Sequence, residues 1–117
     1  MSDYTEPSDL DLLPDLQKLA PAEFAAWENL QGIVGRKDGA IPVKYRELLA
    51  LAVALTTQCP YCLDVHTKAA KAAGASRAEL AETVFIASAL RAGGAGTHGL
   101  LALKLFDGAR VGVHTHA

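Results

Sequence analysis

Aromatic residues are scarce in this sequence, and neither a charge excess nor a long hydrophobic run is present. Only 6% of the 117 residues are aromatic, although 50% are hydrophobic. The 11 Lys and Arg residues are scattered among 13 Asp and Glu residues, and the formal net charge is −2. Proteins that bind nucleic acid usually present a clustered basic surface. We therefore expect no nucleic-acid partner.

The sequence also lacks the features of a membrane or exported protein. Its longest apolar run, Leu48–Leu55, is far shorter than the ~20 residues that span a bilayer. The beginning, MSDYTEPSDLDLLPDL, is acidic and interrupted by proline, unlike a secretory signal. We therefore expect a soluble, cytoplasmic protein without a membrane partner. In that reducing compartment, two neighbouring cysteines are more often redox-active or metal-binding than structural.

The apolar residues that are present, mainly Ala and Leu, favour helices. Proline, glycine and capping signals predict helices over 9–19, 21–34, 43–57, 60–73, 76–92 and 97–108. The GGAG segment at 93–96 is expected to break the chain between the last two helices. We predict an all-α fold with a single domain of about six helices over residues 9–110. A flexible lead-in (1–8) precedes it, and a tail (111–117) follows it.

The last predicted helix carries apolar side chains on every side, and Lys104 is the only charged residue in its interior. The apolar side chains belong to Leu100, Leu101, Leu103, Leu105 and Phe106. A monomer of this size can bury them only with difficulty, and such surfaces usually mark subunit interfaces. We expect a homo-oligomer, and a tightly wrapped monomer is the alternative.

Both cysteines lie in the stretch QCPYCLDVH, residues 58–66. On the first turn of a helix, the spacing of Cys59 and Cys62 brings the two sulfurs within reach of a disulfide. The free N–H groups and the dipole of that helix end stabilise a thiolate and lower the thiol pKa from ~8.5. His66 follows one turn after Cys62, where an imidazole can accept or return a proton. These residues predict reversible dithiol–disulfide chemistry.

Other side chains are further candidates for the same site. Glu47 precedes an apolar stretch that leads into the cysteines, and its carboxylate can orient the histidine or relay a proton. A surface glutamate in a first helical turn is the commoner interpretation. Tyr61 can donate a hydrogen bond at the site or simply pack there. His98 can begin its helix or reach the site from another helix or subunit, whereas His114 and His116 are expected in the tail.

A structural zinc site is the alternative to redox chemistry, because Cys59, Cys62 and His66 can supply three ligands. A closed site needs a fourth ligand, which only His98 or Glu47 can supply, and the sequence has no second CxxC. The GGAG segment lacks the spacing of a nucleotide-binding loop. We therefore expect no bound cofactor and no metal, and electrons from an external thiol donor.

The pattern of Glu47, Cys59-Pro60-Tyr61-Cys62, His66 and the turn that ends in Ala75-Ser76 resembles a known family. It is similar to the carboxymuconolactone decarboxylase superfamily, and within it to the AhpD-like, CxxC-containing alkylhydroperoxidase branch. The motif covers residues 47–76, and the helical layout from about 20 to 108 is compatible. The resemblance implies an all-α fold with a helical hairpin that carries the site, assembled as trimers or hexamers.

The resemblance also implies a thiol-dependent peroxidase or disulfide reductase of antioxidant defence. Its substrate would be an organic hydroperoxide or a protein disulfide, and a dithiol would supply electrons. By this resemblance Cys62 attacks, Cys59 resolves, and His66 with Glu47 relays protons. Peroxidase members carry a histidine where this sequence has Tyr61, and a tyrosine with a pKa of ~10 is a poor proton shuttle. Decarboxylase members generally lack the CxxC, which makes lactone decarboxylation the weaker enzymatic alternative.

Overall fold

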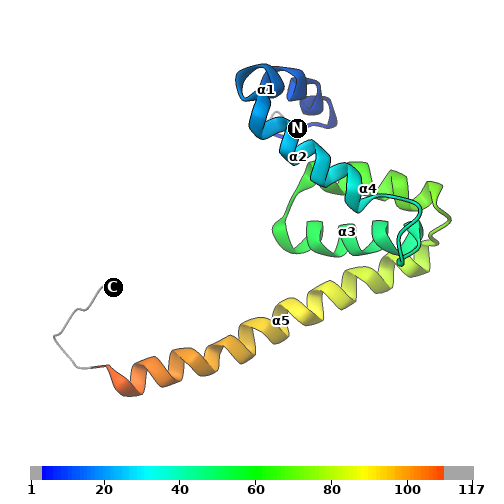
Figure 1. Cartoon of the computed structure of the whole chain (residues 1–117). Helices are drawn as coiled ribbons and strands as arrows, with labels where there is room; N and C mark the ends of the chain where they lie inside the picture. The colour runs from blue at the N-terminus through cyan, green and yellow to red at the C-terminus, as the bar shows by residue number, and fades with distance from the viewer. Residues whose placement is uncertain (1–3, 110–117) are drawn as a thin grey trace.

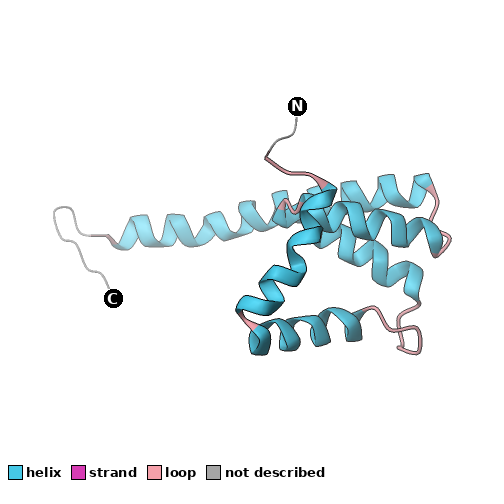
Figure 2. Ribbon diagram, turned by 90° about the horizontal axis from the view of Figure 1, so that it is seen from above, coloured by secondary structure: helices cyan, strands magenta, loops and turns pink. Residues whose placement is uncertain are grey.

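The computed structural model describes residues 4–109, and the regular secondary structure of that part of the chain is entirely helical, with loops between the helices (Figures 1 and 2). A short 3-10 helix, η1, precedes five α-helices. The elements are η1 (Pro7–Leu12), α1 (Leu13–Leu19), α2 (Pro21–Val34), α3 (Val43–Thr57), α4 (Pro60–Ala72) and α5 (Arg77–Gly108). The predicted all-α fold is confirmed. The η1 helix crosses the predicted boundary between the lead-in and the domain, and the predicted tail lies outside the described residues.

Local sequence signals account for the α3–α4 hairpin. Gln58 ends α3 in the left-handed conformation, with φ of 56°, and Cys59 is the N-cap of α4. Pro60 then occupies the first turn of α4, where its missing N–H costs no helical hydrogen bond. With so short a connection, α3 and α4 pack against each other as an antiparallel pair. The hairpin that the family resemblance implied is therefore present.

The predicted break at residues 93–96 is wrong, because α5 runs without interruption for 32 residues. Its start is the expected capping box, in which Ser76 and Glu79 exchange hydrogen bonds of 3.0 and 2.9 Å. Each glycine costs the helix only ~1 kcal/mol relative to Ala, and no proline is present to stop it. Ala- and Leu-rich turns flank these glycines on both sides. The helix continues through the glycines because extending an existing helix is easier than nucleating a new one.

The core is small and lies where α3 packs against α4 and against the first half of α5. Its apolar members are Leu51, Ala54, Ala70 and Ala87, whereas the buried Phe24 lies apart from them on α2, next to Trp27. Thr83 is buried beside them, and its hydroxyl donates to the Glu79 carbonyl at 2.8 Å. Beyond this core α5 continues away from the body of the molecule (Figure 1). Within the described residues, no helix is both long and apolar enough to cross a membrane.

Candidate active site

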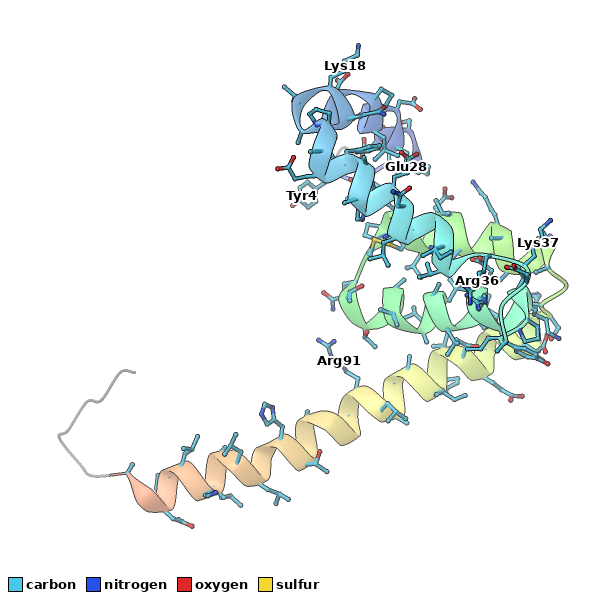
Figure 3. All side chains as sticks on the ribbon, viewed as in Figure 1. Tyr4, Lys18, Glu28, Arg36, Lys37 and Arg91 are labelled. Atoms are coloured by element: carbon cyan, nitrogen blue, oxygen red, sulfur yellow. A yellow bond between two sulfur atoms is a disulfide. The ribbon has the colours of Figure 1, made fainter. Side chains whose placement is uncertain are left out.

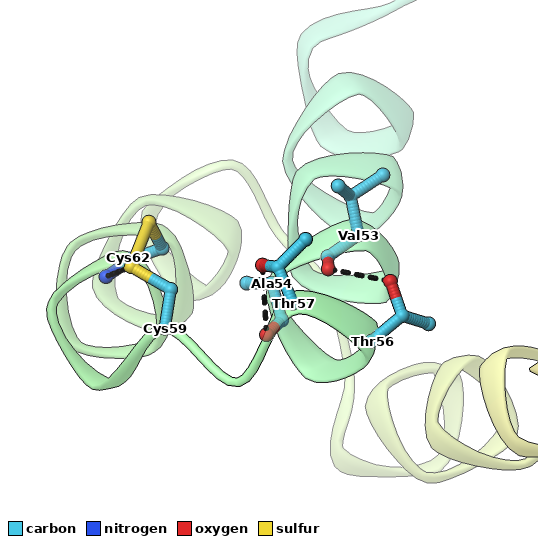
Figure 4. The surroundings of a disulfide bond; sticks show 6 residues. All are labelled: Val53, Ala54, Thr56, Thr57, Cys59 and Cys62. Carbon is cyan, nitrogen blue, oxygen red and sulfur yellow. Dashed lines mark hydrogen bonds between the residues drawn. A yellow bond between two sulfur atoms is a disulfide. The ribbon is translucent and has the colours of Figure 1, made fainter. Parts of the chain in front are cut away.

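The two cysteines form a disulfide at the beginning of α4 (Figures 3 and 4). Their Cα atoms are 5.3 Å apart, a normal separation for a disulfide. The N–H of Cys62 donates to Cys59 Sγ at 3.2 Å, and both residues are partly buried. After reduction the same N–H would stabilise a thiolate on Cys59. The pair is therefore held at disulfide distance by the first turn of a helix.

Two threonines at the end of α3, beside the disulfide, donate hydrogen bonds to carbonyls of the preceding turn (Figure 4). The Thr56 hydroxyl donates to the Val53 carbonyl at 2.8 Å, and the Thr57 hydroxyl donates to the Ala54 carbonyl at 3.4 Å. Carbonyls at a helix C-terminus lack partners within the helix. These hydroxyls are additional donors to carbonyls near the end of α3, where Ala54 also accepts from the N–H of Cys59.

Glu47 and His66 meet across the α3–α4 hairpin. Glu47 Oε1 lies 2.6 Å from His66 Nδ1, and the two side chains are only 12% and 29% exposed. An ionised carboxylate can only accept, so Nδ1 carries the shared proton. In the neutral imidazole, Nε2 is then left as the proton acceptor. The structure thus brings together two of the residues that the sequence had proposed for proton transfer.

This pair lies in a surface hollow of about 360 Å³ between α2, α3 and α4. Its lining is mostly aliphatic, and the cysteines are not part of it. His66 and Cys62 lie one turn apart on α4, but the hydrogen bonds of the described residues include none between the imidazole and either sulfur. His66 and the sulfur pair are thus neighbours on α4, but the cysteines do not line the hollow that holds His66 and its partner Glu47 on α3.

Tyr61 points away from the proton-transfer pair and towards the N-terminal segment. Its hydroxyl donates to Asp9 Oδ2 at 2.8 Å. That bond raises the pKa of the Tyr61 phenol above its ordinary 10.0. The pKa of the Asp9 carboxyl is lowered, mainly by the hydrogen bond from the N–H of Glu6 and to a smaller extent by the one from the Tyr61 hydroxyl. Sequence reasoning missed Asp9, because its 52-residue separation from Tyr61 leaves no local pattern.

His98 is not brought to the site within one chain. It lies on the second half of α5, where its side chain is exposed. His114 and His116 lie outside the described residues. Among residues 4–109, no group of three or more His, Cys, Asp or Glu side chains is arranged to hold a metal ion.

The Tyr61–Asp9 bond should be visible in a titration of the tyrosines. We expect Tyr61 to ionise above the ordinary pH of 10.0, and replacement Asp9→Asn to lower its pKa because the anionic acceptor is lost. The raised pKa means that the bond stabilises the fold below pH 10 and ceases to do so as the phenol ionises. Phenolate absorbance would measure this, with Tyr61→Phe identifying the signal. An unchanged Tyr61 titration in the Asp9→Asn protein would contradict the bond.

Comparisons with known proteins agree with the helical hairpin and its disulfide. Residues 21–105 match the model of the Carboxymuconolactone decarboxylase family. The chain belongs to this family. A crystal structure of an apo carboxymuconolactone decarboxylase family protein from Legionella pneumophila is similar, with a TM-score of 0.61 and 32% identity over 81% of this chain and 84% of that one. The family resemblance is confirmed, and the Cys59–Cys62 disulfide fits its AhpD-like branch.

Two relatives by sequence are bacterial proteins that are named as uncharacterised. A protein of the cox locus of Paracoccus denitrificans is 40% identical over 60% of this chain and 63% of its own length. A protein of Cupriavidus necator is 33% identical over 76% of this chain and 80% of its own length. The match thus spans less than two thirds of the Paracoccus protein. These similarities agree with membership of the family.

Proposed function

We propose that this family member is a thiol-dependent oxidoreductase of the alkylhydroperoxidase type. The observation that carries the proposal is the Cys59–Cys62 disulfide at the start of α4, one helical turn before a histidine that is paired with Glu47 at 2.6 Å. A disulfide that closes within one turn can open and close with little movement of the backbone. The neighbouring acid–base pair supplies the proton transfers that such a cycle requires.

In the peroxide reaction, the Cys62 thiolate attacks the terminal oxygen of an organic hydroperoxide and breaks the O–O bond. The alcohol leaves as its alkoxide takes up a proton, which His66 delivers and Glu47 stabilises on the imidazole. Cys62 is then a sulfenic acid. The Cys59 thiol attacks that sulfur, the disulfide forms, and water is released. Each turnover thus oxidises two thiols and reduces one peroxide to an alcohol and water.

An external dithiol returns the enzyme to its reduced form by thiol–disulfide exchange. The same cycle run against a partner's disulfide gives a disulfide reductase, which needs no peroxide. The position of Tyr61 favours this second substrate class, because its hydroxyl is engaged with Asp9 and its pKa is raised, so it is a poor proton shuttle near neutrality. For either substrate, we propose a role in antioxidant defence in the cytoplasm.

One observation favours a second candidate function. Glu47 and His66 line a hollow that excludes the cysteines, so the pair can act as acid and base without the sulfurs. Decarboxylation of a lactone acid, as the family name suggests, would be chemistry of this kind. This candidate predicts an activity that survives replacement of both cysteines, whereas the redox cycle does not.

The deciding experiment follows the thiols of the purified, reduced protein. After one equivalent of an organic hydroperoxide, we expect intact mass to show the loss of two hydrogens, with no zinc bound beforehand. Cys59→Ser should prevent that loss, because no resolving thiol remains. Thiols that stay unreactive, with one zinc ion per chain and unfolding by a chelator, would instead identify a structural metal site.

A further inference from the structure

One side of the Glu47–His66 hollow is only weakly fastened by packing. Gln31, Val34 and Gly35, where α2 ends, line that side, and we call them the wall. The backbone of α2 packs closely on α1 but makes few close approaches to α3 or α4. Even within the wall, Val34 is 53% exposed. Burial of apolar surface therefore contributes little to holding the wall against α3.

A single side chain, Arg46, bonds both ends of the connection between α2 and α3. It is partly buried in the first turns of α3 and lines the hollow, as does its neighbour Glu47. Its Nε donates to the Ile41 carbonyl and its Nη1 to the Val34 carbonyl, each at 2.8 Å. Val34 is the last residue of α2, so its carbonyl has no partner within the helix. The guanidinium supplies that partner and fastens the end of α2 to the start of α3.

The loop between the two helices is shaped around this guanidinium. A Cβ atom added to Gly39 would collide with the end of the Arg46 side chain. Among the glycines of residues 4–109 only Gly74 has a positive φ, so alanine can adopt the backbone of Gly39 and would displace the guanidinium instead. Arg36 lies on the same loop, labelled in Figure 3, but it is half exposed and pairs with Asp38 at 3.8 Å.

We propose that Arg46 is a positioning residue for the Glu47–His66 pair, because it holds the wall of their hollow against α3. Without its two bonds the wall separates from α3, water enters the hollow, and the imidazole becomes more exposed than its present 29%. An acid–base pair that is shielded from water interacts more strongly than one in water. The effect of Arg46 on turnover rests on the proposed function, whereas its effect on the wall does not.

Arg46→Gln tests the wall without any substrate. We expect the backbone amides of residues 31–41 to exchange hydrogen at least about tenfold faster than in the unmodified protein, with those of α5 unchanged. Peptide mass spectrometry should also show diethylpyrocarbonate modifying His66 at least about threefold faster. Arg36→Gln is the matched control, since it removes the same group from the same loop and leaves both Arg46 bonds in place. It should change neither rate.

Turnover tests the consequence for the acid–base pair. With tert-butyl hydroperoxide as substrate and dithiothreitol as reductant, Arg46→Gln should lower kcat at least about tenfold. The pH dependence of the remaining turnover should move towards that of Glu47→Gln, a change that a smaller folded fraction would not produce. Arg46→Lys should not restore the rate, because a single ammonium cannot reproduce the planar fork that bonds two carbonyls.

Gly39→Ala is a second variant that removes no charge. By displacing the guanidinium it should reproduce the faster exchange and the faster modification of His66, and it decides the matter if Arg46→Gln does not fold. Unchanged exchange and modification in the folded variant, equal effects in Arg36→Gln, or full restoration by Arg46→Lys would each overturn the proposal. If even the unmodified protein leaves the hydroperoxide intact, the proposed function fails, and the exchange and modification rates still decide the role of Arg46.

Discussion

Cys62→Ser is expected to abolish peroxide-dependent and disulfide-dependent turnover, with a loss of at least ~10³-fold relative to the unmodified protein. A serine hydroxyl in the same place is scarcely ionised near neutrality, so the attacking anion is lost. The substitution removes the disulfide but leaves the N-cap residue Cys59 in place. The fold should therefore persist, and circular dichroism would verify this before the activity is compared.

Cys59→Ser is the matched variant, because serine retains an N-cap oxygen for the N–H of Cys62. It should still react once with a hydroperoxide and then stop at a sulfenic acid on Cys62, which a dimedone-type reagent would trap. The opposite result, in which the Cys59→Ser protein is inert and the Cys62→Ser protein forms the sulfenic acid, would reverse the two roles. The structure gives that outcome a physical basis, because the helix N–H points at Cys59 Sγ.

Removing the carboxylate next to His66 should also have a large effect. For Glu47→Gln we expect the turnover of the proposed redox reaction to fall by about 10²–10⁴-fold, the usual contribution of a positioned acid–base group. The amide has no negative charge to stabilise the imidazolium, although it can still occupy the space against Nδ1. Steady-state rates measured across a range of pH would separate a lost proton transfer from a loss of folded protein, which would lower all rates equally.

The pairing itself is tested by a double-mutant cycle of Glu47→Gln and His66→Asn. Because the two side chains share one hydrogen bond of 2.6 Å, the double variant should be little worse than the more damaged single variant. Asp64→Asn is the control, since Asp64 lies on the same helix as His66 and forms an ion pair at 3.0 Å with the exposed Lys68. Additive losses, or an Asp64→Asn effect as large as that of Glu47→Gln, would argue against a relay.

Tyr61 illustrates a contact that no local pattern indicated. The sequence placed it between the cysteines and left open whether it joins the site or packs. In the structure its hydroxyl donates a hydrogen bond to Asp9. Asp9 lies directly after residues 1–8, which the sequence predicted to be a flexible lead-in. The Tyr61 side chain therefore connects the loop of the disulfide to the N-terminal helices, which bury none of their own residues.

The sequence alone determined the features that depend on neighbours within one turn. Proline and capping residues located the starts of α2, α4 and α5, and the CxxC spacing placed the two sulfurs at disulfide distance. The placement of His66 one helical turn after Cys62 followed in the same way from the 3.6-residue period of the helix. Family membership is carried by the same short motif, so the amino-acid sequence was sufficient to indicate it.

The tertiary structure decided the features that depend on packing or on long-range cooperativity. Glu47 meets His66 only because α3 and α4 pack as a hairpin, over a separation of 19 residues, and Asp9 meets Tyr61 over 52 residues. The continuity of α5 through its glycines was also beyond local rules, since helix propagation outweighs their modest individual costs. Period and capping fix the geometry within a helix, whereas contacts between helices depend on how their faces pack.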